Sequence, residues 1–237
     1  MQHAIASQEE WLAARKTLLA KEKEFTKARD ALSAARRDLP WVKVDKDYAF
    51  DTPHGCKSLA DLFGDKSQLV VYHFMLGPGW VQGCPSCSYL ADHFDGMTTH
   101  LAQRDVTFMA VSRAPLAEIE AYKKRMGWHF PWASSFGSDF NRDFGVTFSK
   151  DQTDAKTPAY NYGTVPVNSE ELPGLSAFYK NERGEVFHTY STYARGTESL
   201  TDAYRLLDMT PYGRQQDFED SPPGWPQKPT YGKPSVG

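Results

Sequence analysis

A near-continuous apolar run, Gln68-Leu-Val-Val-Tyr-His-Phe-Met-Leu76, is the feature that most limits the folds open to this chain. A strand that is hydrophobic on both faces is typical of the centre of a parallel sheet with helices packed on each side. Gly77-Pro-Gly79 ends the run, and a helical stretch follows from about Pro85 to Gln103. The sequence therefore predicts an α/β protein built around this strand.

Strands and helices continue to alternate along the rest of the chain. The turn Lys180-Asn-Glu-Arg-Gly184 is typical of a hairpin between the last two strands. Alternation that ends in a hairpin predicts a central mixed sheet flanked by helices. The expected elements are a strand over 106–111, a helix over 115–126, strands over 175–179 and 186–190, and a helix over 198–207.

Residues 1–40 are expected to form a separate N-terminal amphipathic helix. No Gly or Pro occurs between Ser7 and Leu39, and Pro40 disfavours helical geometry in the residue before it. Large apolar residues recur every seven positions, a period typical of a coiled-coil seam with a second copy of the chain. Packing of this row on the chain's own body is the alternative. The row consists of Trp11, Leu18, Phe25, Leu32 and Leu39.

The two remaining parts are an α/β domain over 41–210 and a tail over 211–237. The tail contains six prolines and four glycines, which predicts irregular structure. The net charge is −3, so no basic excess points to a nucleic acid or an anionic membrane. No apolar run approaches the ~18 residues of a membrane-spanning helix, and because the first residues have no cationic start and no apolar stretch, we expect no secretory leader. With only three cysteines, we expect a cytoplasmic protein whose thiols are reduced unless they take part in chemistry.

Gly83-Cys84-Pro85-Ser86-Cys87 lies between the apolar strand and the following helix. Cysteines three positions apart in a first helical turn share one face, within reach of a disulfide. Pro85 suits the first helical position, where its missing N–H costs nothing. Cys84 then lies at the helix N-terminus, where unpaired N–H groups stabilise a thiolate. In this setting the motif predicts a redox dithiol.

The helical pattern separates the roles of the two cysteines. Cys87 begins an inward stripe of apolar residues, and a buried thiol resists ionisation. Cys84, at the exposed end, is therefore the predicted nucleophile, and Cys87 is the predicted resolving thiol. Two inert core cysteines, or half of a zinc site, are the alternatives. The stripe continues through Leu90, Phe94, Met97 and Leu101.

A closed zinc site would need four Cys or His ligands. Cys56 is the only other sulfur ligand of that kind, there is no second CxxC, and the histidines are scattered. We therefore expect no metal and no other cofactor. Oxidation is expected to join Cys84 to Cys87 and to leave Cys56 as a free thiol.

The order strand, CxxC, helix, strand, helix, hairpin, helix resembles the thioredoxin fold. Leu172-Pro-Gly-Leu-Ser-Ala-Phe-Tyr-Lys-Asn-Glu-Arg-Gly-Glu-Val186 is similar to the second half of thioredoxins. The resemblance implies a cis bond before Pro173, places Leu172 opposite the dithiol, and leaves the backbone there open to an extended substrate. An ordinary trans-proline at the first position of a strand is the alternative. Gly55–Gly64 and Phe130-Pro-Trp132 are similar to the peroxiredoxin branch.

Tyr72-His-Phe-Met-Leu-Gly-Pro-Gly-Trp80 followed by Gly83–Ser88 resembles a bacterial thioredoxin-like family of predicted dithiol–disulfide oxidoreductases, numbered 899 among domains of unknown function, over roughly residues 5 to 220. Two departures from relatives stand out. Thioredoxins carry a Trp directly before the CxxC, whereas Trp80 lies four residues before Cys84. Peroxiredoxins carry a Thr or Ser where this chain has Val81, which cannot donate a hydrogen bond to a peroxide.

These observations predict a thiol–disulfide oxidoreductase that acts on a protein or small-molecule disulfide and is recycled by an unidentified reductant. A thiol peroxidase, a metal-binding protein and an interaction protein without redox activity are the alternatives. Trp80 is predicted either to offer the substrate an apolar platform or to be a core aromatic. The expected substrate-binding residues are Trp80, Gly83, Pro85, Ser86, Leu172 and Pro173.

Overall fold

The apolar run of the sequence forms β4 (Gln68–His73), an inner strand of an eight-stranded sheet. The structure is a computed structural model that describes residues 4–214. In the sheet, β4 pairs in parallel with β5 and antiparallel with β9. The strand order is β1 (Val42–Lys43), β10 (Val186–Tyr193), β9 (Gly174–Lys180), β4, β5 (Val106–Ser112), β6 (Trp132–Ser134), β2 (Ala49–Thr52) and β3 (Gly55–Ser58).

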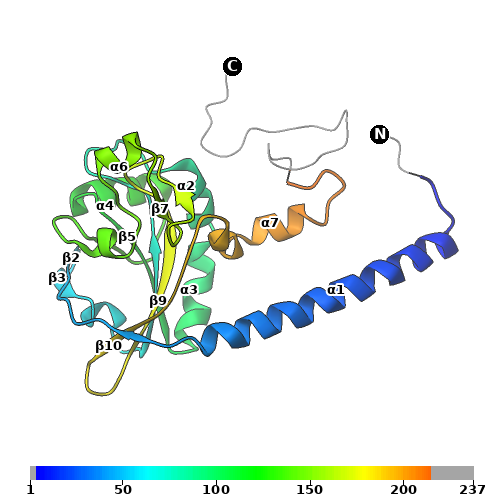
Figure 1. The fold of residues 1–237 in the computed structure, drawn as a ribbon, viewed down its shortest axis with the longest axis horizontal. Coiled ribbons are helices and arrows are strands. Elements are labelled where there is room, and N and C mark those ends of the chain that lie inside the picture. Colours follow the sequence, from blue (N-terminus) through cyan, green and yellow to red (C-terminus); the bar gives the residue numbers. More distant parts are fainter. Residues whose placement is uncertain (1–3, 215–237) are drawn as a thin grey trace.

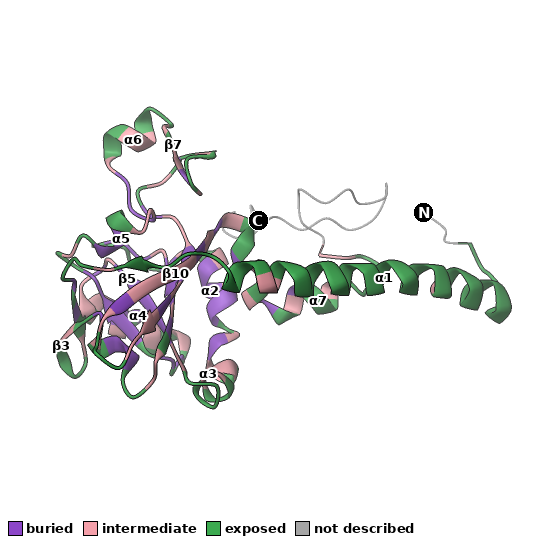
Figure 2. Ribbon diagram, turned by 60° about the horizontal axis from the view of Figure 1, so that its bottom comes forward, coloured by how far each residue is buried: buried purple, intermediate pink, exposed green. Residues whose placement is uncertain are grey.

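Helices cover this sheet, so its central strands are buried on both faces (Figures 1 and 2). One face packs Tyr72, Phe74 and Phe108 against the first helices after the CxxC. The other face packs Leu69, Val71 and Phe178 against η1 (Asp61–Phe63) and the β2–β3 hairpin. The remaining helices are α2 (Pro85–Ala91), α3 (Phe94–Ala102), α4 (Leu116–Met126), α5 (Phe140–Asp143), α6 (Lys150–Asp154), η2 (Ala194–Leu200) and α7 (Asp202–Leu207).

The central topology confirms the expected thioredoxin-like fold. The strand β4 leads into the CxxC and α2, β5 returns parallel to β4, and the β9–β10 hairpin closes the sheet on the other side in the order β10-β9-β4-β5. The strands predicted over 175–179 and 186–190 lie inside β9 and β10. The turn between them is closed by hydrogen bonds around Asn181.

The prediction of two continuous helices, over 85–103 and 198–207, was wrong, because each stretch is divided into two. The stretch 85–103 is divided between α2 and α3 by a turn at Asp92 and His93, where the His93 ring Nδ1 lies 2.9 Å from Tyr89 O. Beside this turn, the carboxylates of Asp92 and Asp95 accept hydrogen bonds from Trp128 Nε1 and from the Phe130 N–H. The stretch 198–207 is divided between η2 and α7, which meet at the extended and fully buried Thr201.

Residues 144–173 form an insert before β9, in a region where the sequence predicts no regular element. It contains α6 and a small hairpin of β7 (Pro158–Tyr160) and β8 (Val165–Pro166). Figure 2 shows α6 and β7 standing out from the main sheet. The insert has its own apolar cluster, which consists of Val146, Phe148, Tyr160, Val167 and Tyr193.

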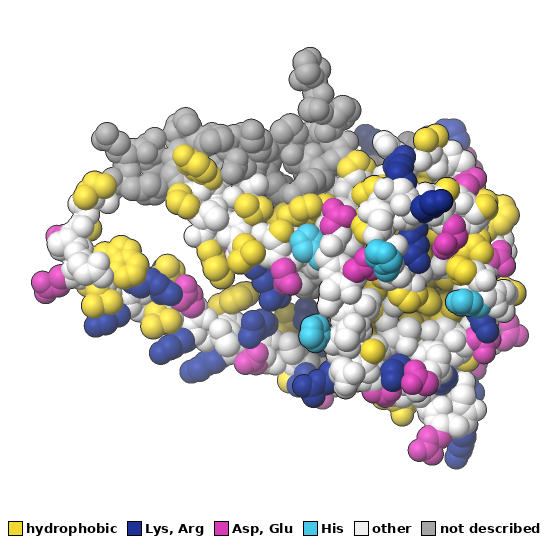
Figure 3. All heavy atoms as spheres, turned by 180° about the vertical axis from the view of Figure 1, so that it is seen from behind, with side chains coloured by type: hydrophobic (Ala, Val, Ile, Leu, Met, Phe, Trp, Pro, Cys, Tyr) yellow, Lys and Arg dark blue, Asp and Glu magenta, His cyan; other side chains and the backbone are white. Residues whose placement is uncertain are grey.

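The helix α1 (Gln8–Arg37) extends away from the rest of the chain as a rod (Figure 1). A capping box between Ser7 and Glu10 begins it, and none of its residues is buried. The row of large residues is exposed, and hydrophobic side chains appear among lysines and arginines along the rod in Figure 3. Packing of the row on the chain's own body, the alternative left open by the sequence, is therefore absent from the described residues.

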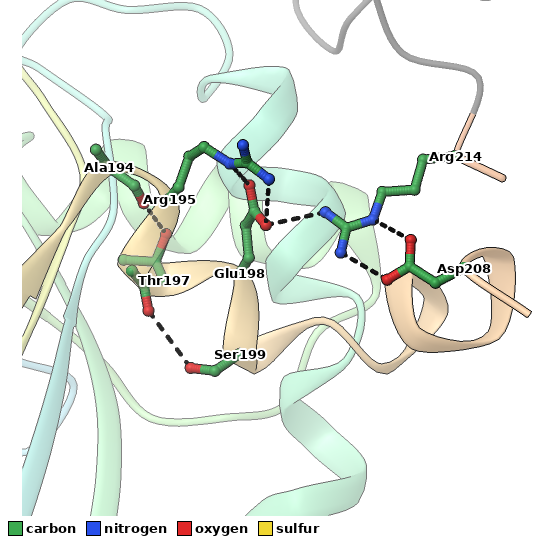
Figure 4. Close-up of polar contacts among 8 residues, drawn as sticks. Ala194, Arg195, Thr197, Glu198, Ser199, Asp208 and Arg214 are labelled. Carbon is green, nitrogen blue, oxygen red and sulfur yellow. Dashed lines mark hydrogen bonds and ion pairs between the residues drawn. The ribbon is translucent and has the colours of Figure 1, made fainter. Parts of the chain in front are cut away.

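The chain after β10 is held by a row of ion pairs. Glu198 accepts hydrogen bonds from Arg195 and Arg214, and Arg214 also binds Asp208 (Figure 4). Arg214 lies 4.3 Å above the ring of Tyr204 in α7. Most of the predicted tail over 211–237 lies outside the described residues. Within residues 4–214, no helix combines the length and hydrophobicity needed to cross a membrane.

Candidate active site

The CxxC lies directly beyond the end of β4, on a loop held against the sheet. The Cys84 N–H donates a hydrogen bond to Met75 O at 3.1 Å, which fixes the start of α2 beside the chain that leaves β4. Gly83 is buried where no side chain fits. A Cβ added there would lie 2.4 Å from Phe74 Cε1 and 2.9 Å from Tyr122 Cε1. Close approach to these rings explains the glycine before the first cysteine.

Cys84 caps α2, with Pro85 at the first helical position, as the sequence predicts. Its sulfur is half-buried and accepts hydrogen bonds from the Cys87 S–H, from the backbone N–H groups of Ser86 and Cys87, and from the Ser86 hydroxyl. These donors, above all the Cys87 thiol, lower the pKa of Cys84 to about 6 against the opposing effect of burial. The thiol is therefore mostly ionised near neutral pH.

Cys87 is 1% exposed, and burial raises its pKa well above the usual range. The proton on Cys87 is also needed for the hydrogen bond to Cys84. The hydroxyl of the buried Tyr72, on β4, contacts the Cys87 sulfur and favours its thiolate. The more exposed sulfur thus carries the charge, and the buried sulfur carries the proton. The helical pattern predicts this order of exposure.

Side-chain hydroxyls also fix the backbone of the first helical turn. Ser88 Oγ donates to Cys84 O at 2.9 Å and lies 2.8 Å from the Tyr122 hydroxyl of α4. Through Ser88 and Tyr122, α4 holds the turn that presents both sulfurs.

No charged residue occurs between Phe74 and Ala91, the stretch that contains the whole motif. The groups that lower the Cys84 pKa are accordingly dipoles, namely S–H, N–H and O–H donors, rather than a cationic side chain. The site holds its negative charge by directed hydrogen bonds.

Trp80 is 37% exposed, so it is not a core aromatic. Its indole packs over Gly77, where an added Cβ would lie 3.0 Å from Trp80 Nε1 and 3.4 Å from Glu171 Cγ. Glu171 is buried and is held by Arg113 Nε at 2.6 Å and by the Thr147 hydroxyl at 2.8 Å. The indole therefore lies between the CxxC loop and the insert.

The expectation of a cis bond before Pro173 was wrong, because the described residues contain no cis peptide bond. The backbone next to it is also not open. The Leu172 N–H donates to Val146 O at 2.9 Å, and the Phe148 N–H donates to Glu170 O at 2.9 Å. No local pattern predicts this pairing, because it forms only where the insert folds back on the segment that precedes β9.

One tyrosine, Tyr160, links Pro173 to the surroundings of the dithiol. The Tyr160 hydroxyl donates a hydrogen bond to Pro173 O and accepts one from the Ala194 N–H at 2.8 Å. Burial, followed by smaller effects that include the nearby Cys87, raises the pKa of Tyr160. Tyr160 and Tyr72 are site residues that the sequence analysis missed. Tyr72 was recognisable only as part of an apolar strand, although its i, i+2 spacing with Phe74 places it on the face that α2 covers.

The third cysteine lies apart from this site. Cys56 is exposed on the edge strand β3, where Asp51 of β2 is its neighbour across the hairpin. Within residues 4–214, no group of three or more His, Cys, Asp or Glu side chains is arranged to hold a metal ion.

The model of a family described as "Bacterial protein of unknown function (DUF899)" matches residues 1–231. None of the curated proteins matches the chain. Solved structures with a similar fold include a peroxiredoxin Q variant from Xylella fastidiosa, with 14% identity, a TM-score of 0.44, and coverage of 71% of this chain and 96% of that one.

Two further similar structures come from other bacteria. Peroxidoxin BcpB from Mycobacterium tuberculosis has 13% identity, a TM-score of 0.45, and coverage of 70% of this chain and 96% of that one. A peroxiredoxin Q variant from Xanthomonas campestris has 16% identity, a TM-score of 0.42, and coverage of 73% and 94%. Similarity at this level carries no inference about activity.

Proposed function

Since the chain belongs to the DUF899 family of bacterial proteins of unknown function, we propose from its own site geometry that it is a thiol–disulfide oxidoreductase. The observation that carries this proposal is the placement of the two thiols of one CxxC, with Cys84 half-buried at the N-cap of α2 and Cys87 1% exposed. Hydrogen-bond donors at this position lower the pKa of Cys84 to about 6, whereas burial raises the pKa of Cys87. A thiolate next to a protonated partner thiol is the arrangement required for attack followed by resolution.

The proposed reaction has two exchange steps. The Cys84 thiolate attacks one sulfur of a substrate disulfide, forms a mixed disulfide and expels the other substrate sulfur as a thiolate. Cys87 then loses its proton and attacks Cys84 Sγ, which forms the Cys84–Cys87 disulfide and expels the second substrate thiolate. The substrate gains two electrons and the dithiol loses two. Two equivalents of a reducing thiol, or a dithiol, return the protein to its starting state.

The surroundings of the two sulfurs support both steps. In the first step, the negative charge leaves Cys84, so its hydrogen-bond donors are released. In the second step, the charge has to form on Cys87, where the Tyr72 hydroxyl is the group placed to stabilise it. Resolution is accordingly the step that depends on Tyr72.

Peroxidase activity has less support at this site. Val81 is 88% exposed and has no hydroxyl to polarise a peroxide. Hydrogen peroxide consumption with a thiol reductant serves as a control on the proposal. Turnover of peroxide at a rate above that of disulfides would indicate that the protein is a peroxidase that uses the same Cys84, and would overturn the proposal.

The test uses the full chain and two variants. After mild oxidation, peptide mapping should show Cys84 joined to Cys87 and Cys56 as a free thiol. Cys87→Ser should trap mixed disulfides on Cys84, and mass spectrometry would identify the trapped thiol. Cys56→Ser is the matched control and should leave the Cys84–Cys87 disulfide unchanged. A disulfide that contains Cys56, or no reversible disulfide at all, would contradict the proposal.

A further inference from the structure

We infer that the dithiol, in the role proposed above, exchanges with low-molecular-weight thiols and disulfides rather than with extended polypeptide chains. The inference rests on the proposed function and on the backbone around Leu172. An extended chain binds a sheet edge through unpaired backbone N–H and C=O groups. A thiol of low molecular weight needs only access to the Cys84 sulfur.

The chain's own insert occupies the backbone edge that leads to Pro173, whose carbonyl accepts the hydroxyl of Tyr160. Between 146–148 and 170–172, the Leu172 N–H and the Phe148 N–H each donate to the opposite segment at 2.9 Å, and Thr147 and Glu171 form an antiparallel bridge between them. An extended substrate would have to displace these hydrogen bonds before it could form its own. Replacing internal hydrogen bonds by equivalent external ones gives little net free energy.

The groups next to this edge are engaged as well. Pro173 has no N–H, and its carbonyl accepts the Tyr160 hydroxyl, so it offers no free donor and has one acceptor already bound. On the side that faces the CxxC loop, Glu171 Cγ lies 3.4 Å from the position of a Cβ on Gly77. The segment is thus covered by the insert on one side and by the loop on the other.

The Cys84 sulfur itself remains open to a small reactant. Cys84 is half-buried, and Val81 and Pro85 beside it are exposed. Access to the sulfur combined with an occupied backbone edge selects by the size and the backbone of the substrate.

The experiment measures kcat/KM of the full chain for three mixed disulfides that share the same leaving thiol. The first carries cysteine alone. The second carries one cysteine in a flexible ten-residue peptide. The third is the same peptide with N-methylated amides on both sides of the cysteine. If a peptide docked through two backbone hydrogen bonds, N-methylation would lower kcat/KM about tenfold or more. We expect a change below about twofold, and a higher kcat/KM for the cysteine disulfide than for either peptide.

A second measurement uses hydrogen exchange and does not depend on activity. The Leu172 amide should be protected in the free protein and should stay equally protected when a peptide disulfide is trapped on Cys87→Ser. Rapid exchange of Leu172 in the free protein, or a peptide preferred over cysteine and slowed by N-methylation, would overturn the inference. If Cys84 attacks none of the three disulfides, the proposed function itself is refuted.

Discussion

Replacement of Cys87 by alanine should raise the pKa of Cys84, because the Cys87 S–H is the largest of the influences that lower it. The lowering from 9.0 to about 6 corresponds to about 4 kcal/mol in favour of the thiolate. A hydrogen bond to a charged group contributes about 1.5–3 kcal/mol, so its loss should raise the pKa by about 1–2 units. The alanine variant is therefore expected to titrate near pH 7–8, since the backbone N–H groups and Ser86 remain.

The consequence can be measured as a rate of alkylation. Near pH 7, a thiol with a pKa of about 6 is about 90% ionised, and the shift would leave about 10–50%. The rate of alkylation of Cys84 by iodoacetamide, followed across the full pH range, should have its midpoint displaced upward by the same ~1–2 units, whereas the rate at pH 7 alone is less informative because a thiolate of higher pKa is also the stronger nucleophile. The experiment is done in a Cys56→Ser background, so that only one reactive thiol is followed.

Cys87→Ser is the matched control, because a hydroxyl at that position keeps a donor for the Cys84 sulfur. Its pKa should lie between those of the unsubstituted protein and the alanine variant. Equal pKa values for the serine and alanine variants and the unsubstituted protein would refute the reasoning, because the Cys87 side chain would then contribute nothing to thiolate stability.

Four further outcomes are expected. Gly83→Ala should lower the midpoint of thermal unfolding and the rate of disulfide attack, because the added Cβ would lie 2.4 Å from the Phe74 ring. Gly96→Ala in α3 is the control and should be neutral or stabilising in the same melts, because an added Cβ there has no neighbour within 4 Å. Burial lowers the pKa of His73 to about 3, so its neutral form contributes stability that is present above pH 6.5 and lost as the pH falls toward 3. The free energy of unfolding from urea titrations should fall by up to ~1.4 kcal/mol per pH unit below pH 6.5, and His73→Gln should flatten that slope. Tyr72→Phe should slow resolution of a mixed disulfide several-fold and leave the first attack by Cys84 unchanged. Stopped-flow measurements with a chromogenic disulfide distinguish the two steps, and equal effects on both would count against the role of Tyr72. If α1 pairs with a second copy through its exposed row, light scattering should give a dimer for the full chain and a monomer for Phe25→Lys or for a chain without residues 1–39. A monomeric full chain would refute pairing through α1.

Much of the central fold was predictable because its signals are local. The run that forms β4 is apolar on both faces, the CxxC follows it, and the turn at Lys180–Gly184 joins two strands. The different exposure of Cys84 and Cys87 follows from helical spacing alone. Each of these features depends on residues fewer than about ten positions apart.

The features that were missed depend on short strands or distant contacts. The strands β1 and β6 have two and three residues, too few for any periodicity to appear. The bond between Leu172 and Val146 joins segments that are brought together only by the insert, and no local pattern predicts it. The contacts beside the break between α2 and α3 likewise involve Trp128 and Phe130, which reach Asp92 and Asp95 only in the folded chain.

The position of β9 in the sheet has a consequence for synthesis of the protein. The strand β4 needs β9 as its antiparallel neighbour, and β9 is made about 90 residues after Cys84. At a translation rate of about 5–20 residues per second, the ribosome needs about 5–20 s to complete that interval. During this time β4 lacks the neighbour that completes the sheet on which α2 packs. Oxidants and thiols that meet the nascent chain therefore reach Cys87 more easily than in the folded protein, where this thiol is 1% exposed.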